Sequence, residues 1–256
     1  MEINKKYLNR IGLDRVKILV EIESIDLSKI KDIENLAYAE VGERKFISIE
    51  DRETGEYKRI KGYKYIADGY GIYVTKEFGK IVVFLDITMP RVYYNQGHNV
   101  YNIYTKDQAK ETLELAKKYL EENGIYLNSI EHWKVRVVEI NKTYECNIQR
   151  ERYMDCLKYI YDNVNRDHKY KYSTKARLEK NNIVIYWEDK DIQIYDKTVQ
   201  MLDKYDKKLD IQIYRTELTY TDKVSIAGKF GSNNIDILYD FEKISEVYES
   251  EMKRLG

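Results

Sequence analysis

The sequence predicts an α+β protein with an antiparallel β-sheet core and helices packed mainly on one face. The first third holds short runs rich in Val, Ile and Tyr, separated by Gly and charged turns. Residues 106–123 carry the apolar spacing of an amphipathic helix. The remainder alternates strand, helix, hairpin, strand and helix. Short connections between strands are typical of antiparallel pairing, because parallel strands need long crossovers.

The first third is predicted to be almost entirely β-structure. Residues 16–25 (VKILVEIESI) form the first expected strand, and the runs FISIE, YKYIA, GIYVT and KIVVFLDI follow between 46 and 87. No Gly/Ser-rich or Pro-rich linker divides the chain. We therefore expect a single domain over 1–256, in which a β-rich N-terminal lobe (1–88) precedes the half that carries the candidate catalytic residues (89–256).

Two helices are predicted in the second half. Thr105 caps the helix over 106–123 and Gly124 ends it. Its expected apolar stripe comprises Ala109, Leu113, Leu115, Ala116 and Leu120. The second helix covers about 148–163, with an apolar side made by Tyr153, Leu157 and Ile160. Strands are expected at 133–141 and 209–220, and helical segments at the C-terminal end.

Residues 182–197 (NIVIYWEDKDIQIYDK) predict a β-hairpin whose turn is Glu188–Asp191. In that register Trp187 pairs with Ile192, and Ile185 pairs with Ile194. Side chains alternate between the two faces of a strand. One face then holds Ile183, Ile185, Trp187, Ile192 and Ile194. The other face holds Val184, Tyr186, Gln193, Tyr195 and Lys197, which places two tyrosine hydroxyls near an amine.

The composition excludes several classes of protein. Lys+Arg and Asp+Glu both total 44, which excludes a nucleic-acid binder held by net charge alone but permits a local basic groove. No apolar run approaches the roughly 20 residues that span a bilayer, and the N-terminus lacks the apolar region of a secretory signal. Two cysteines ten residues apart do not make a disulfide framework. We expect a cytoplasmic protein without membrane contact.

Two glutamates occupy positions that continue apolar rows. Glu139 follows Val135 and Val137 in WKVRVVEIN, and Glu217 follows Arg215 in IQIYRTELTY. A carboxylate facing a core is costly unless it is paired or bound to a metal. Each row can also run out to solvent at its strand end, or Glu217 can pair with Arg215 or Lys197. Because carboxylate oxygens suit Mg²⁺ or Mn²⁺, the two acids are candidate metal ligands.

A divalent ion beside a tyrosine hydroxyl points to phosphodiester chemistry. The tyrosine displaces the 3′ oxygen and becomes a covalent phosphotyrosine, while a lysine such as Lys197 stabilises the developing charge. Residues 168–180 (HKYKYSTKARLEK) fit a strand of nucleic acid, because basic residues would follow phosphates while rings stack on bases. The residues concerned are Lys169, Tyr170, Lys171, Tyr172, Lys175 and Arg177. A solvated loop is the alternative for this segment.

The order of these motifs resembles the replication initiators of filamentous phages and of related rolling-circle plasmids and integrative elements. The resemblance covers roughly 85–245 and rests on the strand VRVVEIN, the strand end IYDK and the Arg-x-Glu strand at Arg215–Glu217. It implies a replication-initiator (Rep nuclease)-like fold and a metal-dependent DNA nickase and strand transferase. Glu139 and Glu217 match its acids, and Asp196 and Lys197 match its Tyr-Asp-Lys end.

The resemblance places the nucleophile at Tyr186, with Tyr195 as the second candidate. Plasmid relatives have a Gly-Ser turn after this tyrosine, whereas this chain has the acidic WEDKD. The partners implied are origin DNA (single-stranded or hairpin), a host helicase and polymerase, and a second copy in a homodimer. Two other functions stay open. One is a non-catalytic origin-binding or regulatory protein on the same fold, and the other is a β-rich interaction domain whose motif matches are chance.

Overall fold

The computed structural model describes residues 1–26, 29, 46–50, 57–61, 63–67, 69–77, 80–166, 175–179 and 181–255. Its strands are β1 (Ile11–Ile25), β2 (Phe46–Glu50), β3 (Tyr57–Lys61), β4 (Tyr63–Ala67), β5 (Tyr70–Glu77), β6 (Lys80–Thr88), β7 (Ile125–Leu127), β8 (Lys134–Glu145), β9 (Lys175–Leu178), β10 (Asn182–Tyr186), β11 (Lys190–Asp196) and β12 (Ile213–Tyr220). Its α-helices are α1 (Met89–Tyr94), α2 (Lys106–Glu122), α3 (Arg150–Arg166), α4 (Lys197–Tyr205), α5 (Lys223–Phe230) and α6 (Phe241–Met252). Short 3-10 helices cover Lys5–Tyr7, Ile130–His132 and Ile235–Tyr239.

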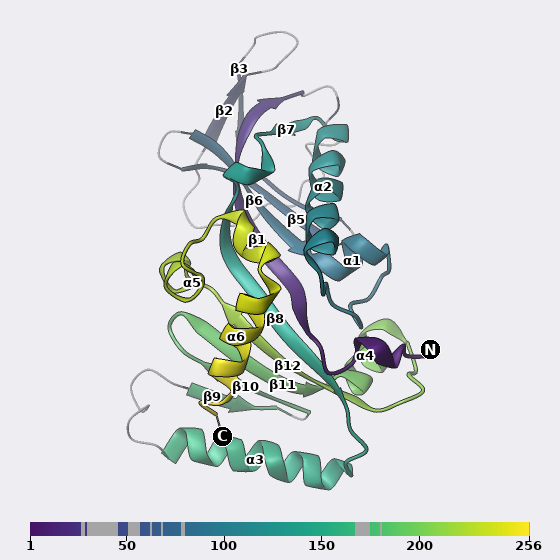
Figure 1. Ribbon diagram of the computed structural model, residues 1–256. Helices are drawn as coiled ribbons and strands as arrows, with labels where there is room; N and C mark the ends of the chain where they lie inside the picture. The colour runs from purple at the N-terminus through teal and green to yellow at the C-terminus, as the bar shows by residue number, and fades with distance from the viewer. Residues whose placement is uncertain are drawn as a thin grey trace.

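One large antiparallel sheet organises the chain, and the protein is of the α+β class. The strand order is β4-β5-β6-β1-β8-β12-β11-β10-β9, with β7 paired to the far end of β1 (Figure 1). Strand β1 comes from the first residues of the chain, yet it lies between β6 and β8. Strands β1, β4, β5 and β6 therefore share one sheet with the later strands, whereas β2 and β3 pair with each other in a separate two-stranded sheet.

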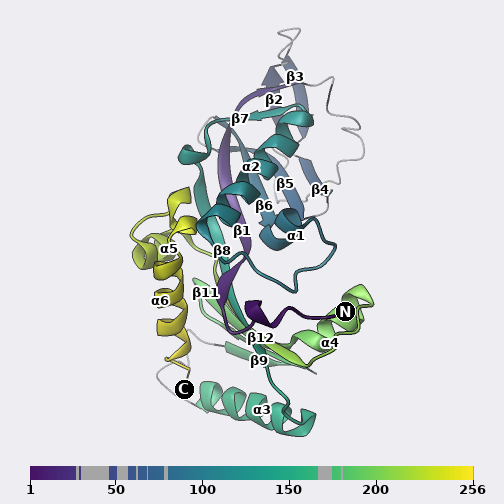
Figure 2. The same cartoon turned by 45° about the vertical axis from the view of Figure 1, so that its right-hand side comes forward.

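The two faces of this sheet differ in polarity. One face is apolar, and it packs against α1, α2, α5, α6 and the 3-10 helix Ile235–Tyr239 in the main core, with α3 covering β10 in a smaller cluster. The apolar face contributes Val16, Ile87, Val138, Ile140, Ile192, Leu218 and Tyr220. Figures 1 and 2 show α2 beside the β1–β6 part of the sheet, α6 along β8 and α3 below β9 and β10. The prediction of helices mainly on one face is consistent with this arrangement.

The opposite face, here called the polar face, is covered by described residues at one end only. Helix α4 and the N-terminal residues pack there around Ile213 in a small apolar cluster with Ile3, Leu8, Val100, Met201 and Leu209. Beyond the end of β6, Ile103 forms an antiparallel bridge to Leu13 of β1, and its side chain belongs to the main core. Gly12 permits the close approach, since a Cβ there would lie 2.6 Å from the carbonyl oxygen of Ile103.

The predicted helix over 106–123 is confirmed as α2. The Thr105 side chain accepts a hydrogen bond from the Gln108 amide, which caps the first turn. The buried stripe is Ala109, Thr112, Leu113, Ala116 and Leu120. The assignment of Leu115 to that stripe was wrong, because Leu115 is 38% exposed on the outer surface. The second predicted helix is confirmed as α3, with Tyr153 and Leu157 buried.

The hairpin is confirmed, but its predicted register was wrong by two residues. Trp187 N–H donates to the Lys190 carbonyl at 2.8 Å, so the turn is Glu188–Asp189. Ile185 pairs with Ile192, and Tyr186 pairs with Asp191. A shift by two residues keeps the strand side chains on their predicted faces, whereas Lys197, which was predicted to lie on the strand, begins α4. The prediction that Val135, Val137 and Glu139 share one face of β8 was also wrong. The pairing of β8 with β1 shifts between Lys17 and Ile18, so Val135 is buried on the apolar face while Val137 and Glu139 lie on the other.

Among the described residues, no helix combines the length and the apolar character that a membrane span requires.

Candidate functional site

Three carboxylates meet on the polar face at the edge of its covered end. Asp14 of β1, Glu139 of β8 and Glu217 of β12 each offer an oxygen within 4.8 Å of the others. Glu217 pairs across strands with Asn141, and Glu139 pairs with Thr219, so the two glutamates are diagonal neighbours on one face. Asp14 lies where the register of β1 against β8 shifts between Leu13 and Arg15. This acidic cluster is therefore built from three adjacent strands.

Asp14 has donors on one oxygen and none on the other. Its Oδ2 accepts from Asn99 Nδ2 at 2.7 Å, from Asn141 Nδ2 at 3.1 Å and from the Arg215 guanidinium at 3.1 Å. Its Oδ1 is buried and accepts no hydrogen bond from the described residues, although Asp14 is only 1% exposed. A buried carboxylate oxygen without a donor is costly, and a bound cation is one way to satisfy it.

Glu217 is held in place by a buried tyrosine. The Tyr195 hydroxyl donates to Glu217 Oε1 at 2.5 Å, and the Arg215 guanidinium lies 3.9 Å from the same oxygen. These contacts leave Glu217 Oε2 available to a ligand. Glu139 is half-buried and faces the open part of the sheet. The cluster thus has donors behind it and one side toward solvent.

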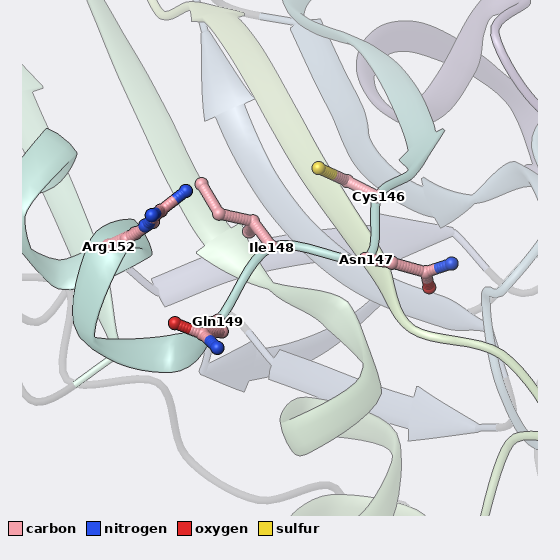
Figure 3. A pocket seen from close by; sticks show the side chains of 5 residues that line it. All are labelled: Cys146, Asn147, Ile148, Gln149 and Arg152. Atoms are coloured by element: carbon pink, nitrogen blue, oxygen red, sulfur yellow. The ribbon is translucent and has the colours of Figure 1, made fainter.

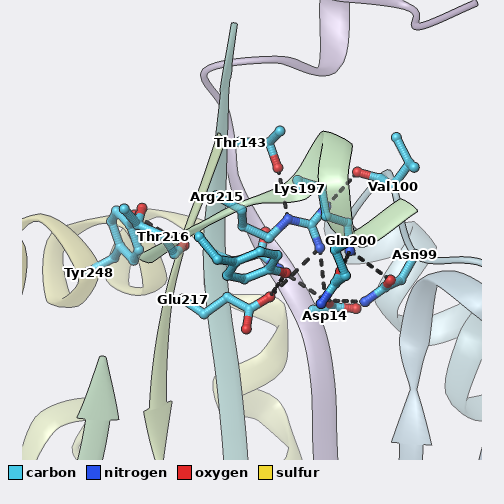
Figure 4. A network of polar contacts seen from close by, with 12 residues as sticks. Asp14, Asn99, Val100, Thr143, Lys197, Gln200, Arg215, Thr216, Glu217 and Tyr248 are labelled. Carbon is cyan, nitrogen blue, oxygen red and sulfur yellow. Dashed lines mark hydrogen bonds and ion pairs between the residues drawn. The ribbon is translucent and has the colours of Figure 1, made fainter. Parts of the chain in front are cut away.

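Arg215 is the fixed cation of the site. It is fully buried, and it donates to Asp14, to Thr143 Oγ1 at 3.0 Å and to the Val100 carbonyl at 2.6 Å (Figure 4). Thr216, the next residue of β12, points to the opposite side of the strand and contacts Tyr248 of α6. Because side chains alternate along a strand, Arg215 faces the polar site while the next residue, Thr216, faces the helix-covered core.

Lys197 begins α4 and is fully buried beside the cluster. Its ammonium donates to Asn99 Oδ1 at 2.9 Å and to Gln200 Oε1 at 2.7 Å. Burial, with the nearby charge of Arg215, lowers the pKa of Lys197 to about 7. Asn99 connects Lys197 to Asp14, because its amide donates to the carboxylate while its oxygen accepts from the amine.

The acidic cluster carries more negative charge than its neighbours offset. Burial and the charges of Glu217 and Asp14 raise the pKa of Glu139 well above its usual value. Burial also raises the pKa of Glu217, although Arg215 opposes that effect. The three carboxylates carry more negative charge than the Arg215 guanidinium and Lys197, whose pKa is lowered, offset together, and a divalent cation would offset the excess. The all-oxygen donor set fits Mg²⁺ or Mn²⁺, with Asp14, Glu139 and Glu217 as the candidate ligands.

Tyr186 lies on the same face but outside this cluster. Cross-strand pairing gives one continuous row, Lys175–Tyr186–Asp191–Thr219–Glu139–Arg15. Tyr186 and Glu139 are three strand spacings apart along this row, about 14 Å between backbones. The Tyr186 side chain is 41% exposed. The structure therefore brings together Glu139, Glu217, Tyr195, Lys197 and Arg215 and leaves Tyr186 in the open part of the face.

The two candidate tyrosines differ in availability. Tyr195 is 4% exposed and its hydroxyl is engaged with Glu217. Burial and the charge of Glu217 raise the pKa of Tyr195 well above its usual value, which makes this phenol a poor nucleophile. Tyr186, by contrast, is 41% exposed. The geometry thus favours Tyr186 as the exposed hydroxyl and gives Tyr195 the task of holding Glu217.

Part of the predicted nucleic-acid segment lies beside Tyr186. Lys175 pairs with Tyr186 across β9 and β10, and Arg177 pairs with Val184. Both cations are exposed, and Arg177 is 3.0 Å from Glu179. Lys169, Tyr170, Lys171 and Tyr172 lie outside the described residues.

Three residues of the site were missed from the sequence: Asp14, Asn99 and Asn141. The predicted first strand begins at residue 16 and therefore leaves Asp14 out, although an acid after the Gly12-Leu13 pair interrupts the apolar run in IGLDRVKILV. Asn99 stands next to His98 in a segment interpreted only as a turn. Nothing in its local sequence indicates a contact with β1 or α4, because both contacts depend on the tertiary fold.

A surface pocket lies elsewhere, at the connection between β8 and α3. It is lined by Cys146, Asn147, Ile148, Gln149 and Arg152 (Figure 3). Cys146 is an exposed free thiol. The pocket contains no member of the acidic cluster and one charged side chain, so we do not assign the function to it.

Comparisons with known proteins do not show a family. No protein-family model matches the chain, and no curated protein matches it. Among solved structures, the chain is similar to the di-domain ARO/CYC BexL from the BE-7585A biosynthetic pathway, with 10% sequence identity, a TM-score of 0.24 and coverage of 94% of this chain and 95% of that chain. At that TM-score the likeness carries no argument about fold or function.

Proposed function

We propose that this chain is a metal-dependent DNA-nicking replication initiator, of the kind that filamentous phages and rolling-circle plasmids use. In this proposal Asp14, Glu139 and Glu217 hold a divalent cation, and Tyr186 is the nucleophile. The acidic cluster supplies the cation site, and the polar face of the sheet supplies the surface on which a DNA strand lies.

The observation that carries the proposal is the unsatisfied oxygen of Asp14 within the acidic cluster. A structural ion-pair network satisfies its buried oxygens, as Glu251 does elsewhere in this chain. Asp14 Oδ1 has no donor among the described residues, and it lies in the one carboxylate cluster of the described chain with metal-ligand spacing. An orphaned buried acceptor beside two glutamates with raised pKa values supports a cation site.

The chain's residues would divide the reaction between them. When bound, the cation would polarise the scissile phosphate and offset its charge. The Tyr186 oxygen forms a bond to phosphorus, the bond from phosphorus to the 3′ oxygen breaks, and the phenolic proton passes to solvent. The 3′ oxygen takes a proton from solvent. The products are a 5′-phosphotyrosine and a free 3′ hydroxyl that can prime synthesis.

The spacing along the row sets a requirement for the reaction. Because the Tyr186 and Glu139 backbones lie about 14 Å apart along the sheet, attack on a phosphate held at the cation requires the hairpin that carries Tyr186 to move toward the acidic cluster when DNA binds. Lys175 stands beside Tyr186 at one end of the row and Arg15 beside Glu139 at the other. Because the Arg15 guanidinium is paired with Asp86 at 2.6 Å, a phosphate backbone that crosses the polar face would meet an exposed basic side chain at the Lys175 end.

Covalent adduct formation tests the proposal. Purified protein is incubated with Mn²⁺ and either a radiolabelled pool of random single-stranded oligonucleotides or a supercoiled plasmid that carries the coding region of this chain. We expect a DNA–protein adduct that survives SDS, requires Mn²⁺ and is lost in Tyr186→Phe. Tyr159→Phe is the matched control, because Tyr159 is 70% exposed on α3, away from the polar face. An adduct that persists in Tyr186→Phe would assign the nucleophile to another tyrosine.

A second function is favoured by the separation of Tyr186 from the acidic cluster. A protein of the same fold that binds origin DNA without cleaving it needs no nucleophile within reach of the cation. DNA binding that weakens steeply with salt, with no adduct from wild-type protein under any divalent cation, would select this binding function over the nickase.

A further inference from the structure

A second buried carboxylate lies behind the hairpin that carries Tyr186. Glu251, near the end of α6, is 2% exposed. Its oxygens contact the ammonium groups of Lys190 at 2.5 Å and Lys229 at 2.6 Å, and they accept a hydrogen bond from the Tyr220 hydroxyl at 3.0 Å. Arg254 adds a weaker contact at 3.5 Å. Glu251 therefore joins β11, β12, α5 and α6 at one point.

Lys190 is the contact that reaches the hairpin. It is the first residue of β11, and its carbonyl accepts the Trp187 N–H that closes the turn. Its ammonium also lies 5.1 Å from the centre of the Trp187 ring. On the other side of the turn, the Asp189 carbonyl accepts from the Thr221 N–H at 2.9 Å. The turn is thus fixed to α6 by a side chain and to the end of β12 by backbone.

Tyr186 depends on this turn for its position. Tyr186 and its partner Asp191 are the first pair beyond Trp187 and Lys190, and alternation places them on the opposite face. Within the described part of the chain, the structure gives the Tyr186 side chain no hydrogen bond or ion pair of its own. The backbone of the hairpin therefore decides where the exposed hydroxyl stands on the polar face.

We propose that the Lys190–Glu251 ion pair is a positioning device for Tyr186, acting through the hairpin turn from behind the sheet. The inference rests on the proposed function, in which Tyr186 is the nucleophile. The ion pair is well suited to this task, since the Lys190 side chain is 10% exposed and is screened little by solvent. A nucleophile displaced by about 1 Å from its attack position can lose about a hundredfold in rate.

The chain offers a matched pair of variants for the test. Lys190→Met and Lys229→Met each remove one ammonium from Glu251 and keep an apolar stem, but only Lys190 belongs to the hairpin. At saturating Mn²⁺ and DNA, we expect the single-turnover rate of adduct formation to fall about tenfold or more in Lys190→Met and to change less than about twofold in Lys229→Met. DNA affinity should stay the same in both variants, and Lys190→Arg should restore the rate.

Amide hydrogen exchange supplies a measurement that does not depend on cleavage. We expect the Trp187 N–H to exchange faster in Lys190→Met than in Lys229→Met. If wild-type protein forms no adduct but this difference in exchange is observed, the proposed function fails and the positioning of the hairpin stands. Equal exchange in the two variants, or equal losses of rate, would overturn the inference and leave Glu251 as a stabilising contact only.

Discussion

Two of the buried carboxylate sites in the described part of the chain lie on opposite faces of one sheet, and they are built on opposite principles. Glu251 is a single carboxylate that contacts three cationic side chains and a tyrosine hydroxyl. The acidic cluster has three carboxylates, one guanidinium within 4 Å and a buried oxygen without a donor. The positive charge around Glu251 exceeds the negative charge of its carboxylate, whereas the positive charge around the acidic cluster is smaller than the negative charge of its three carboxylates.

The pKa values express the same contrast. Burial alone would raise the pKa of Glu251, but hydrogen bonds from Lys190 and Lys229 lower it to about 2. At Glu139, burial and neighbouring carboxylates act in the same direction, and its pKa rises. A carboxylate with a lowered pKa stabilises the fold at neutral pH, whereas one with a raised pKa costs stability there. A cost that no internal donor offsets is typical of a site built for a ligand.

The largest effect on stability is expected when the charge of Glu251 is removed. Glu251→Gln leaves Lys190 and Lys229 without their counter-ion, so we expect the free energy of unfolding at pH 7 to fall by about 3 kcal/mol. Because the folded pKa is lowered, the wild-type advantage is full above the unfolded value near 4.5 and disappears as pH falls toward about 2. Urea unfolding at pH 7 and pH 3 measures both values.

Glu249→Gln is the control for this change, because Glu249 is exposed on the same helix. We expect it to alter stability by less than about 0.5 kcal/mol. An equal loss in the two variants would show that α6 tolerates no change of charge, and the contrast between the two sites would lose its support.

The second effect is stabilisation by a divalent cation. If the acidic cluster binds Mn²⁺ in the folded state only, a concentration one hundred times the Kd should add about 2.7 kcal/mol to the free energy of unfolding. Thermal unfolding with and without Mn²⁺ measures this gain. We expect it to vanish in Glu217→Gln and to persist in Glu251→Gln, which keeps the acidic cluster. A gain of equal size in Glu217→Gln would place the cation elsewhere.

The sequence predicted the parts of the site that follow from strand alternation. Arg215 and Glu217 lie on one face of β12, as a period of two predicts. Glu139 joins them on that face only because an irregularity in β8 separates it from Val135, with which the sequence had grouped it. Tyr186 and Tyr195 were assigned to the correct face even though the hairpin register was wrong by two residues, since a shift of two preserves the face.

The missed parts depend on contacts between distant segments. Asp14 reaches the cluster because β1 inserts between β6 and β8, and its orientation arises at a register shift that no local pattern encodes. Asn99 and Lys197 meet through the packing of α4 against the segment after α1. Lys190 and Glu251 are 61 residues apart in the sequence, and no local pattern distinguishes either of them from an ordinary charged surface residue.

The smallest expected effect is a gain in the free energy of unfolding, whereas Glu251→Gln causes a loss. This difference in sign distinguishes the two sites most sharply. Glu139→Gln removes one charge from a cluster with too many, so we expect the free energy of unfolding at pH 7 in the absence of metal to rise by about 1 kcal/mol. Because the folded pKa of Glu139 is raised, wild-type stability should itself increase as pH falls from 7 toward the unfolded value near 4.5, as the carboxyl takes up a proton. The difference between wild type and variant should therefore shrink at pH 5.

The same variant should lose both its stabilisation by Mn²⁺ and its adduct formation. A Glu139→Gln protein that is less stable than wild type at pH 7 would mean that the carboxylate is already satisfied in the fold, and the argument for a cation at the cluster would fail with it.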